Sequence, residues 1–136
     1  MKRTATALWN GTGKEGSGTL TTESKVLNQT SYSHRTRFTD VEGTSPEELI
    51  AAAHAGCYSM KLGFVIVAAG ATPEKIETVC TVTIESGTIT NSHLVVKASV
   101  AGATSEQFQT WAEEAKSSCP VSKALNTNVT LEASLA

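Results

Sequence analysis

The sequence has few aromatic residues and no excess of basic charge, and both absences limit the functions it can carry. Phe, Trp and Tyr make up 5% of its 136 residues, too few for a platform on which nucleic-acid bases stack. Eleven Lys and Arg residues stand against 13 Asp and Glu residues, so the net charge is −2 and no basic field exists to hold a phosphate backbone. We therefore expect no nucleic-acid partner.

Closely spaced cysteines are also missing. Cys57, Cys80 and Cys119 are odd in number and far apart, which is not the pattern of a disulfide-stapled secreted domain. No Cys-x-x-Cys occurs and the three histidines are scattered, so we expect no metal site and no cofactor. The first residues lack the apolar core of a signal peptide, and the expected location is the reducing cytoplasm.

Only one stretch is apolar over a long distance, at residues 49–71. Its 23 residues are enough to span a bilayer, but Lys61 lies near the middle, where a lysine costs roughly 3 kcal/mol in lipid. His54 and seven alanines weaken the tendency to insert further. We interpret the stretch as a buried helix of a soluble protein and expect no membrane partner.

The remaining composition is that of one globular domain over residues 1–136. Hydrophobic residues make up 40% and charged residues 18%, which excludes a disordered or fibrous chain. Periodicity and turn signals predict an α+β fold with a β-rich N-terminal part, a long central helix, a β-hairpin, two further helices and a final strand. The expected strands cover residues 4–9, 19–27, 33–38, 76–85, 94–100 and 128–135, with a turn at 87–92, and the two later helices begin at Thr104 and Pro120.

The central helix has a clear start and end. Ser45 is a favourable N-cap, Pro46 fits the first helical position, and Glu48 completes a capping box. Gly70 and Pro73 predict the end of the helix. The helical spacing of five residues predicts its buried stripe: Leu49, Ala53, Cys57, Met60 and Phe64.

Two cysteines are candidates for chemistry. Cys57 follows the small residues Ala55 and Gly56 within the helix, which allow other groups to approach its sulfur. Cys119 directly precedes Pro120 at a helix start, where free backbone N–H groups favour a thiolate. Residues so far apart in the chain can still meet in space, which makes a redox pair possible. Cys80 lies in a strand and is interpreted as structural.

A thiolate at neutral pH needs a neighbouring cation, because a free cysteine is mostly protonated there. Arg37 is a candidate for this cation, and Glu47 for the carboxylate that orients it through an ion pair. By itself, Arg37 is better explained as an arginine on the surface of a strand, and composition does not choose between an ion-pair role for Glu47 and one that serves only the helix dipole.

His54 supports a competing hypothesis. It precedes Cys57 by three residues, so the two side chains can share a helix face and form the Cys–His pair of a thiol hydrolase. No oxyanion loop or orienting carboxylate accompanies this pair. A third alternative is a non-catalytic stress protein that binds a small molecule.

Several segments resemble the OsmC branch of the OsmC/Ohr family, whose members are thiol-dependent peroxidases acting on organic hydroperoxides. The resemblance covers essentially the whole chain and depends most on two segments: Ser45-Pro46-Glu47-Glu48-Leu49-Ile50-Ala51-Ala52-Ala53-His54-Ala55-Gly56-Cys57-Tyr58-Ser59-Met60 and Cys119-Pro120-Val121-Ser122. Thr36-Arg37-Phe38 matches as well. The hairpin turn after Ser86 is shorter than expected for the family, and Gly56 replaces another small residue.

The resemblance implies a role for each candidate. Cys57 corresponds to the peroxidatic cysteine and Cys119 to the resolving cysteine; Arg37 corresponds to the arginine that holds the thiolate and Glu47 to its partner. The implied reaction passes through a Cys57 sulfenic acid and a Cys57–Cys119 disulfide, which an external dithiol reduces. Residues such as Met60 and Phe64 are expected to line an apolar pocket for an organic hydroperoxide.

The position of Glu47 predicts a dimer. Ten helical residues separate it from Cys57, a distance of about 15 Å along the helix axis, and the two residues lie on different faces. Glu47 and Arg37 are therefore expected to reach Cys57 from a second subunit. The family resemblance likewise implies an intertwined homodimer with active sites at the interface.

Overall fold

The computed structural model describes all residues from Met1 to Ala136. The chain forms two compact units, Met1–Leu49 and Ile50–Ala136, and each is described by itself. The expectation of one domain over the whole chain stays a prediction. The α+β class is confirmed, with three strands in the first unit and three strands and most of the helical residues in the second.

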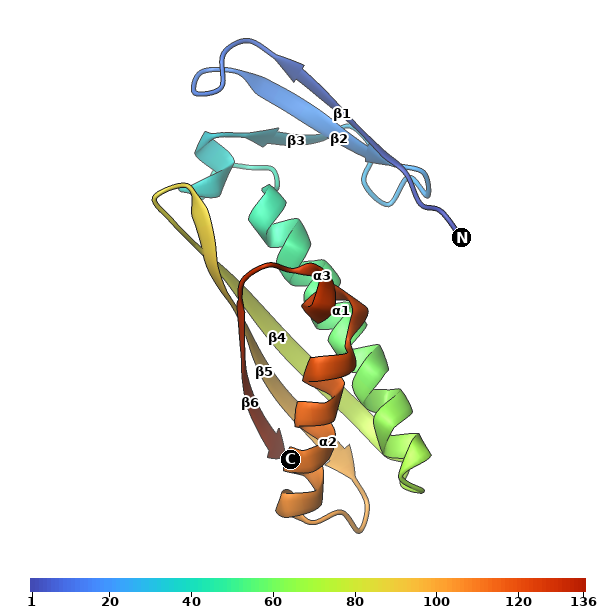
Figure 1. Ribbon diagram of the computed structural model, residues 1–136. Helices are drawn as coiled ribbons and strands as arrows, with labels where there is room; N and C mark the ends of the chain where they lie inside the picture. Colours follow the sequence, from blue (N-terminus) through green and yellow to red (C-terminus); the bar gives the residue numbers. More distant parts are fainter. The chain divides into compact units, whose positions relative to one another are not determined.

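The first unit is an antiparallel sheet in the order β1-β2-β3 (Figure 1). Strand β1 (Ala5–Asn10) is confirmed, but β2 (Ser17–Thr22) ends five residues before the predicted end at residue 27. The hydroxyl of Thr22 accepts a hydrogen bond from the backbone N–H of Leu27 at 3.1 Å, so this segment closes a turn instead of extending the strand.

The third strand also differs from its prediction. Strand β3 is Thr30–Ser33, and the predicted strand at residues 33–38 is wrong because Arg35–Arg37 form the 3₁₀ turn η1. The backbone N–H of Thr36 donates to Ser33 Oγ at 3.2 Å, and that of Ser33 donates to Thr36 Oγ1 at 3.0 Å. These local bonds compete with a sheet ladder and place Arg37 at the end of a tight turn.

Helix α1 (Pro46–Ala68) begins and ends as predicted. The Glu48 N–H donates to Ser45 Oγ at 3.2 Å, as a capping residue requires. The Glu48 carboxylate instead accepts a 2.7 Å bond from the Thr44 hydroxyl, so only half of the predicted box forms. Gly70 follows the helix with φ of +85°, the left-handed conformation that ends many helices.

The second unit has its helices on one face of a sheet in the order β4-β5-β6 (Figure 1). Strands β4 (Pro73–Glu85) and β5 (Thr88–Val100) are antiparallel, and β6 (Asn128–Leu135) runs parallel to β5. The predicted turn at 87–92 is wrong because Ser86 and Gly87, with φ of +50° and +79°, complete a two-residue turn and pairing resumes at Thr88.

Helices α2 (Ser105–Ser118) and α3 (Pro120–Ala124) agree with their predictions. The capping box of α2 is complete, with Thr104 and Gln107 each bonded to the other's backbone N–H. Cys119 lies between the two helices, as the C-cap of α2 and the N-cap of α3.

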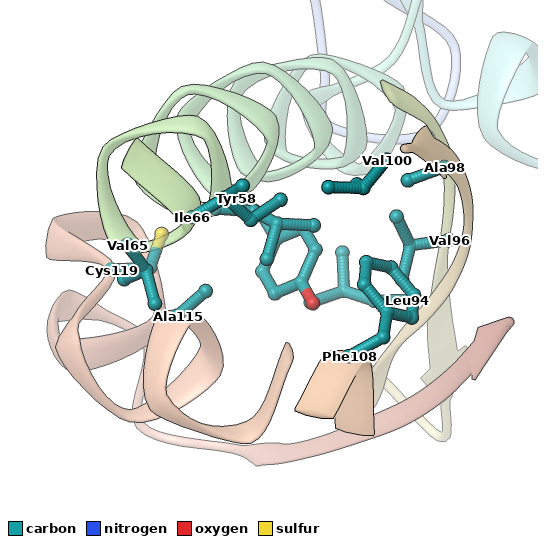
Figure 2. Close-up of a cluster of buried hydrophobic side chains, with 11 residues drawn as sticks. Tyr58, Val65, Ile66, Leu94, Val96, Ala98, Val100, Phe108, Ala115 and Cys119 are labelled. Carbon is teal, nitrogen blue, oxygen red and sulfur yellow. The ribbon is translucent and has the colours of Figure 1, made fainter. Parts of the chain in front are cut away.

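The core of this unit lies between the helices and the sheet (Figure 2). The buried stripe of α1 is not the predicted one. Met60 and Phe64 are 65% and 73% exposed, and the buried face one position away consists of His54, Tyr58, Leu62, Val65 and Ile66. Because α1 is apolar on both faces, composition gave no sign of which face the sheet covers. By length and composition α1 is also apolar enough to cross a membrane, a test that core helices of soluble proteins pass too.

Candidate active site

The two cysteines singled out in the sequence meet in the second unit. Cys57 lies at the edge of the buried face of α1 and is partly exposed, whereas Cys119 is fully buried against the core, where Figure 2 shows its sulfur near Val65 and Ala115. Cys57 packs against the core cluster that contains Cys119, and each thiol shifts the pKa of the other, although 62 positions separate them in the chain. Both are free thiols. This proximity is what a disulfide between them requires.

The pKa values of the two thiols are shifted in opposite directions. Burial raises the pKa of Cys57, and hydrogen bonding to Cys119 raises it further, while the backbone N–H of Val121 acts in the opposite direction. Burial also opposes ionisation of Cys119, but hydrogen bonds from the Ser122 backbone, the Cys57 thiol and the Ser122 hydroxyl leave its pKa below the usual value. The pKa of Cys57 is thus shifted upward and that of Cys119 downward, and each thiol contributes to the shift of the other.

An open depression of about 290 Å³ lies beside Cys57. Its other lining residues are Met60, Lys61, Phe64, Ser118 and Pro120. Lys61 and Ser118 were missed in the sequence, although the i, i+4 spacing of Cys57 and Lys61 was a usable signal. The apolar side chains give this surface affinity for a hydrocarbon group next to the Cys57 sulfur.

The first unit contains the predicted ion pair. Arg37 Nε lies 3.1 Å from both carboxylate oxygens of Glu47. A bidentate pair would use two guanidinium nitrogens, but here the single Nε of Arg37 is shared between the two carboxylate oxygens of Glu47. The terminal guanidinium nitrogens of Arg37 form no hydrogen bond within the chain, and its side chain is 35% exposed. They remain able to bind another anion.

His54 is not placed for the competing hydrolase. Its Nδ1 lies 2.7 Å from Ser92 Oγ and its Nε2 lies 2.8 Å from Ser122 Oγ. Both ring nitrogens therefore have partners, and neither partner is Cys57. Cys80 makes a 3.3 Å contact with Ser92 and burial raises its pKa, and its purely structural role stays a prediction.

Two thiols in contact, one beside an open apolar depression and one buried, define a thiol-based redox protein. Comparison with known proteins specifies the class. The model of the OsmC-like protein family matches residues 39–134, and Peroxiredoxin OsmC of Escherichia coli K12 is 43% identical over 130 residues, which are 93% of this chain and 91% of that protein. The chain belongs to the OsmC family.

Solved structures agree with this assignment. The OsmC-like protein of Mycoplasma pneumoniae has a TM-score of 0.77 at 15% identity, covering 100% of this chain and 98% of the other. The organic hydroperoxide resistance protein OhrB of Bacillus subtilis has a TM-score of 0.69 at 25% identity, covering 98% of each chain. The predicted OsmC-like fold is thereby confirmed.

Proposed function

We propose that this protein is a thiol-dependent peroxidase that reduces organic hydroperoxides to alcohols. The contact between Cys57 and Cys119, in a chain of the OsmC family, is the observation that carries the proposal. Its relatives' names, Peroxiredoxin OsmC and organic hydroperoxide resistance protein, refer to the same chemistry.

Cys57 is the residue that meets the peroxide, because it is partly exposed and lines the depression. Its thiolate attacks the outer peroxide oxygen, the O–O bond breaks, and the alkoxide leaves and takes a proton to become the alcohol. Cys57 is then a sulfenic acid. Cys119 attacks the Cys57 sulfur, water leaves, and a disulfide forms. An external dithiol returns both cysteines to thiols by exchange, in the reducing cytoplasm.

The substrate's organic group binds against Met60 and Phe64. Both side chains are more than half exposed and line the depression next to Cys57. An alkyl or fatty-acid chain gains about 25 cal/mol for each Å² of apolar surface removed from water there. Hydrogen peroxide gains nothing, so organic hydroperoxides react faster.

Activation of Cys57 requires a cation from a second subunit. The raised pKa of Cys57 means that one chain does not by itself supply a thiolate at this position. Glu47 and Cys57 belong to the same helix, ten residues or about 15 Å apart along its axis, so the Arg37–Glu47 pair serves the Cys57 of a partner. The free guanidinium nitrogens of the partner's Arg37 then stabilise the thiolate and the charge developing on the peroxide oxygens.

A homodimer also accounts for the apolar surface of α1. Met60, Phe64 and Val67 are 65%, 73% and 60% exposed, and they lie on one side of the helix. Contiguous exposed apolar residues of this kind mark an interface. Each active site is thus composite, with Cys57 and Cys119 from one subunit and Arg37 and Glu47 from the other.

Intact mass spectrometry tests the proposal. One equivalent of cumene hydroperoxide is added to the reduced protein, and the expected product is a species lighter by about two mass units, with Cys57 linked to Cys119. A Cys80→Ser variant serves as the control and forms the same link. A disulfide that involves Cys80, or no change in mass, overturns the proposal.

A further inference from the structure

A continuous line of polar side chains crosses the second unit behind Cys119. Cys80 on β4 contacts Ser92 on β5 at 3.3 Å, Ser92 contacts His54 on α1 at 2.7 Å, and His54 contacts Ser122 on α3 at 2.8 Å. Ser122 is the third residue of α3, whose N-cap is Cys119, and its hydroxyl lowers the pKa of the Cys119 thiol. His54 and Ser92 are 0% exposed, so four separate elements bring these groups together away from water.

With Cys119 ionised and His54 neutral, the number of available hydrogens sets the direction of every bond in this line. When the Ser122 hydroxyl donates to a Cys119 thiolate, it has no second hydrogen, so it must accept from His54 Nε2–H. Burial lowers the pKa of His54, which keeps the ring neutral, so Nδ1 is an acceptor and the Ser92 hydroxyl donates to it. Ser92 then accepts from the thiol of Cys80, which burial keeps protonated. All the donors point toward Cys119.

We propose that His54 is a positioning residue that acts through Ser122 on Cys119: it holds the Ser122 hydroxyl hydrogen on the Cys119 sulfur, so that Cys119 enters disulfide formation as a thiolate. The inference rests on the proposed peroxidase function, to which it adds the control of the second step. Aligned donors strengthen one another in a buried line of this kind.

Disulfide formation between Cys119 and Cys57 exchanges one S–O bond for one S–S bond. Cys119 loses its proton to solvent, and its thiolate attacks the sulfur of the Cys57 sulfenic acid. The S–S bond forms, the S–O bond breaks, and the departing hydroxide takes a proton from solvent to become water. Cys119 is oxidised and Cys57 is reduced by the same electron pair.

Titratable side chains approach this line from several elements. Cys57 and Tyr58 on α1 interact electrostatically with Cys119, and His54 and Cys80 belong to the line itself. Lys61 lines the depression beside Cys57, and Glu113 on α2 acts on Tyr58. Burial is the cause of the lowered pKa of His54, and hydrogen bonds are the cause of the lowered pKa of Cys119 once burial is overcome. Removing the Ser122 hydroxyl therefore tests how much this one group lowers the pKa of Cys119.

The experiment follows disulfide closure directly. Reduced full-length protein is mixed with cumene hydroperoxide, quenched at intervals, and analysed by mass spectrometry for the sulfenic acid and the disulfide, over a range of pH. In Ser122→Ala, closure at pH 7 is expected to slow about tenfold and its pH midpoint to rise by about one unit, the effect of losing one hydrogen bond to a charged sulfur. Ser122→Thr keeps the hydroxyl and restores both quantities.

Two further variants complete the design. His54→Gln moves the midpoint in the same direction as Ser122→Ala, and combining the two changes adds little, because both act through one hydroxyl. Ser117→Ala removes an exposed serine hydroxyl from the end of α2 and leaves closure unchanged. An unchanged midpoint in Ser122→Ala, or equal slowing in Ser122→Thr, overturns the inference. Failure of the unaltered protein to form any disulfide overturns the peroxidase function itself, so the two results are distinguishable.

Discussion

At the scale of single residues, the chemistry depends on two sulfur atoms with opposite tendencies to ionise. In one chain, burial keeps Cys57 protonated and hydrogen bonds make Cys119 the better anion. In the proposed mechanism, Cys57 therefore depends on a cation from the partner subunit for its activation, whereas hydrogen bonds within the chain already favour the Cys119 thiolate.

Replacing Cys119 with serine separates the two steps. Cys119→Ser is expected to consume one equivalent of peroxide, to gain about 16 mass units at Cys57 and to form no internal disulfide, because the attacking sulfur is missing. The readout is intact mass after one and after several equivalents. Cys80→Ser is the matched control and cycles normally. A Cys119→Ser variant that still cycles with an external dithiol at the original rate contradicts the assignment of Cys119.

Arg37 is expected to control the first step. Arg37→Gln removes the positive charge, so the pKa of Cys57 stays high and sulfenic acid formation at pH 7 slows by about tenfold or more. Stopped-flow measurement of the first oxidation against pH shows this as a midpoint displaced to higher pH. Arg35→Gln is the control, since Arg35 lies in the same 3₁₀ turn and is exposed. Equal slowing in both variants contradicts a specific role for Arg37.

His54 gives the protein a defined response to acid. Its pKa is lowered by burial, so the unfolded chain binds a proton more readily than the folded one. The resulting stability is fully present above about pH 6.5, the unfolded value, and is lost as pH falls toward the lower folded value. In urea titrations between pH 8 and pH 5, the free energy of unfolding falls less steeply in His54→Gln than in the unaltered protein. Equal slopes in the two proteins would contradict this origin of the acid response.

At the scale of elements, α1 has two apolar faces with different uses. His54, Tyr58 and Leu62 face the sheet, while Met60 and Phe64 remain exposed around the depression at Cys57. Cys57 lies at the border between them, so its sulfur contacts Cys119 on one side and open space on the other. The same helix therefore contributes to the core and to the substrate surface.

The hairpin between β4 and β5 depends on its two-residue turn. Gly87 has φ of +79° and open space where a Cβ would be, so Gly87→Ala introduces backbone strain without a clash. It is expected to lower the free energy of unfolding by about 1 kcal/mol, measured by chemical denaturation. Gly87→Asn should lose less, because asparagine tolerates the left-handed region better. Equal losses in the two variants would mean that strain is not the cause.

At the scale of the whole molecule, assembly completes the proposed site. Val67→Glu places a charge on the exposed apolar face of α1, outside the depression beside Cys57, and is expected to give a monomer with at least tenfold lower peroxidase activity, because the partner's Arg37 is lost from Cys57. Size-exclusion chromatography with light scattering measures the first effect and a peroxide-consumption assay the second. Val79→Glu, an exposed position on β4, is the control. A monomer with full activity contradicts the composite site.

Local signals in the chain were enough to locate the helices, most strands and both cysteines of the pair. The Ser45-Pro46 start, the Thr104–Gln107 capping box and the Cys119-Pro120 junction were all predicted because caps and prolines act through neighbouring residues. The resemblance of the Pro46–Met60 and Cys119–Ser122 segments to the OsmC branch likewise pointed to the family that the comparisons confirmed.

Other features were decided only by the tertiary structure, since they depend on which elements pack together. Which face of α1 is buried could not be determined locally, because both faces are apolar and the sheet selects one. The line of hydrogen bonds from Cys80 through His54 to Ser122 joins four elements, and the residue spacing within a single element does not predict it. The chain alone thus specified the elements and the reactive residues, while three-dimensional packing brought the two sulfurs together, because they belong to parts of the chain 62 positions apart.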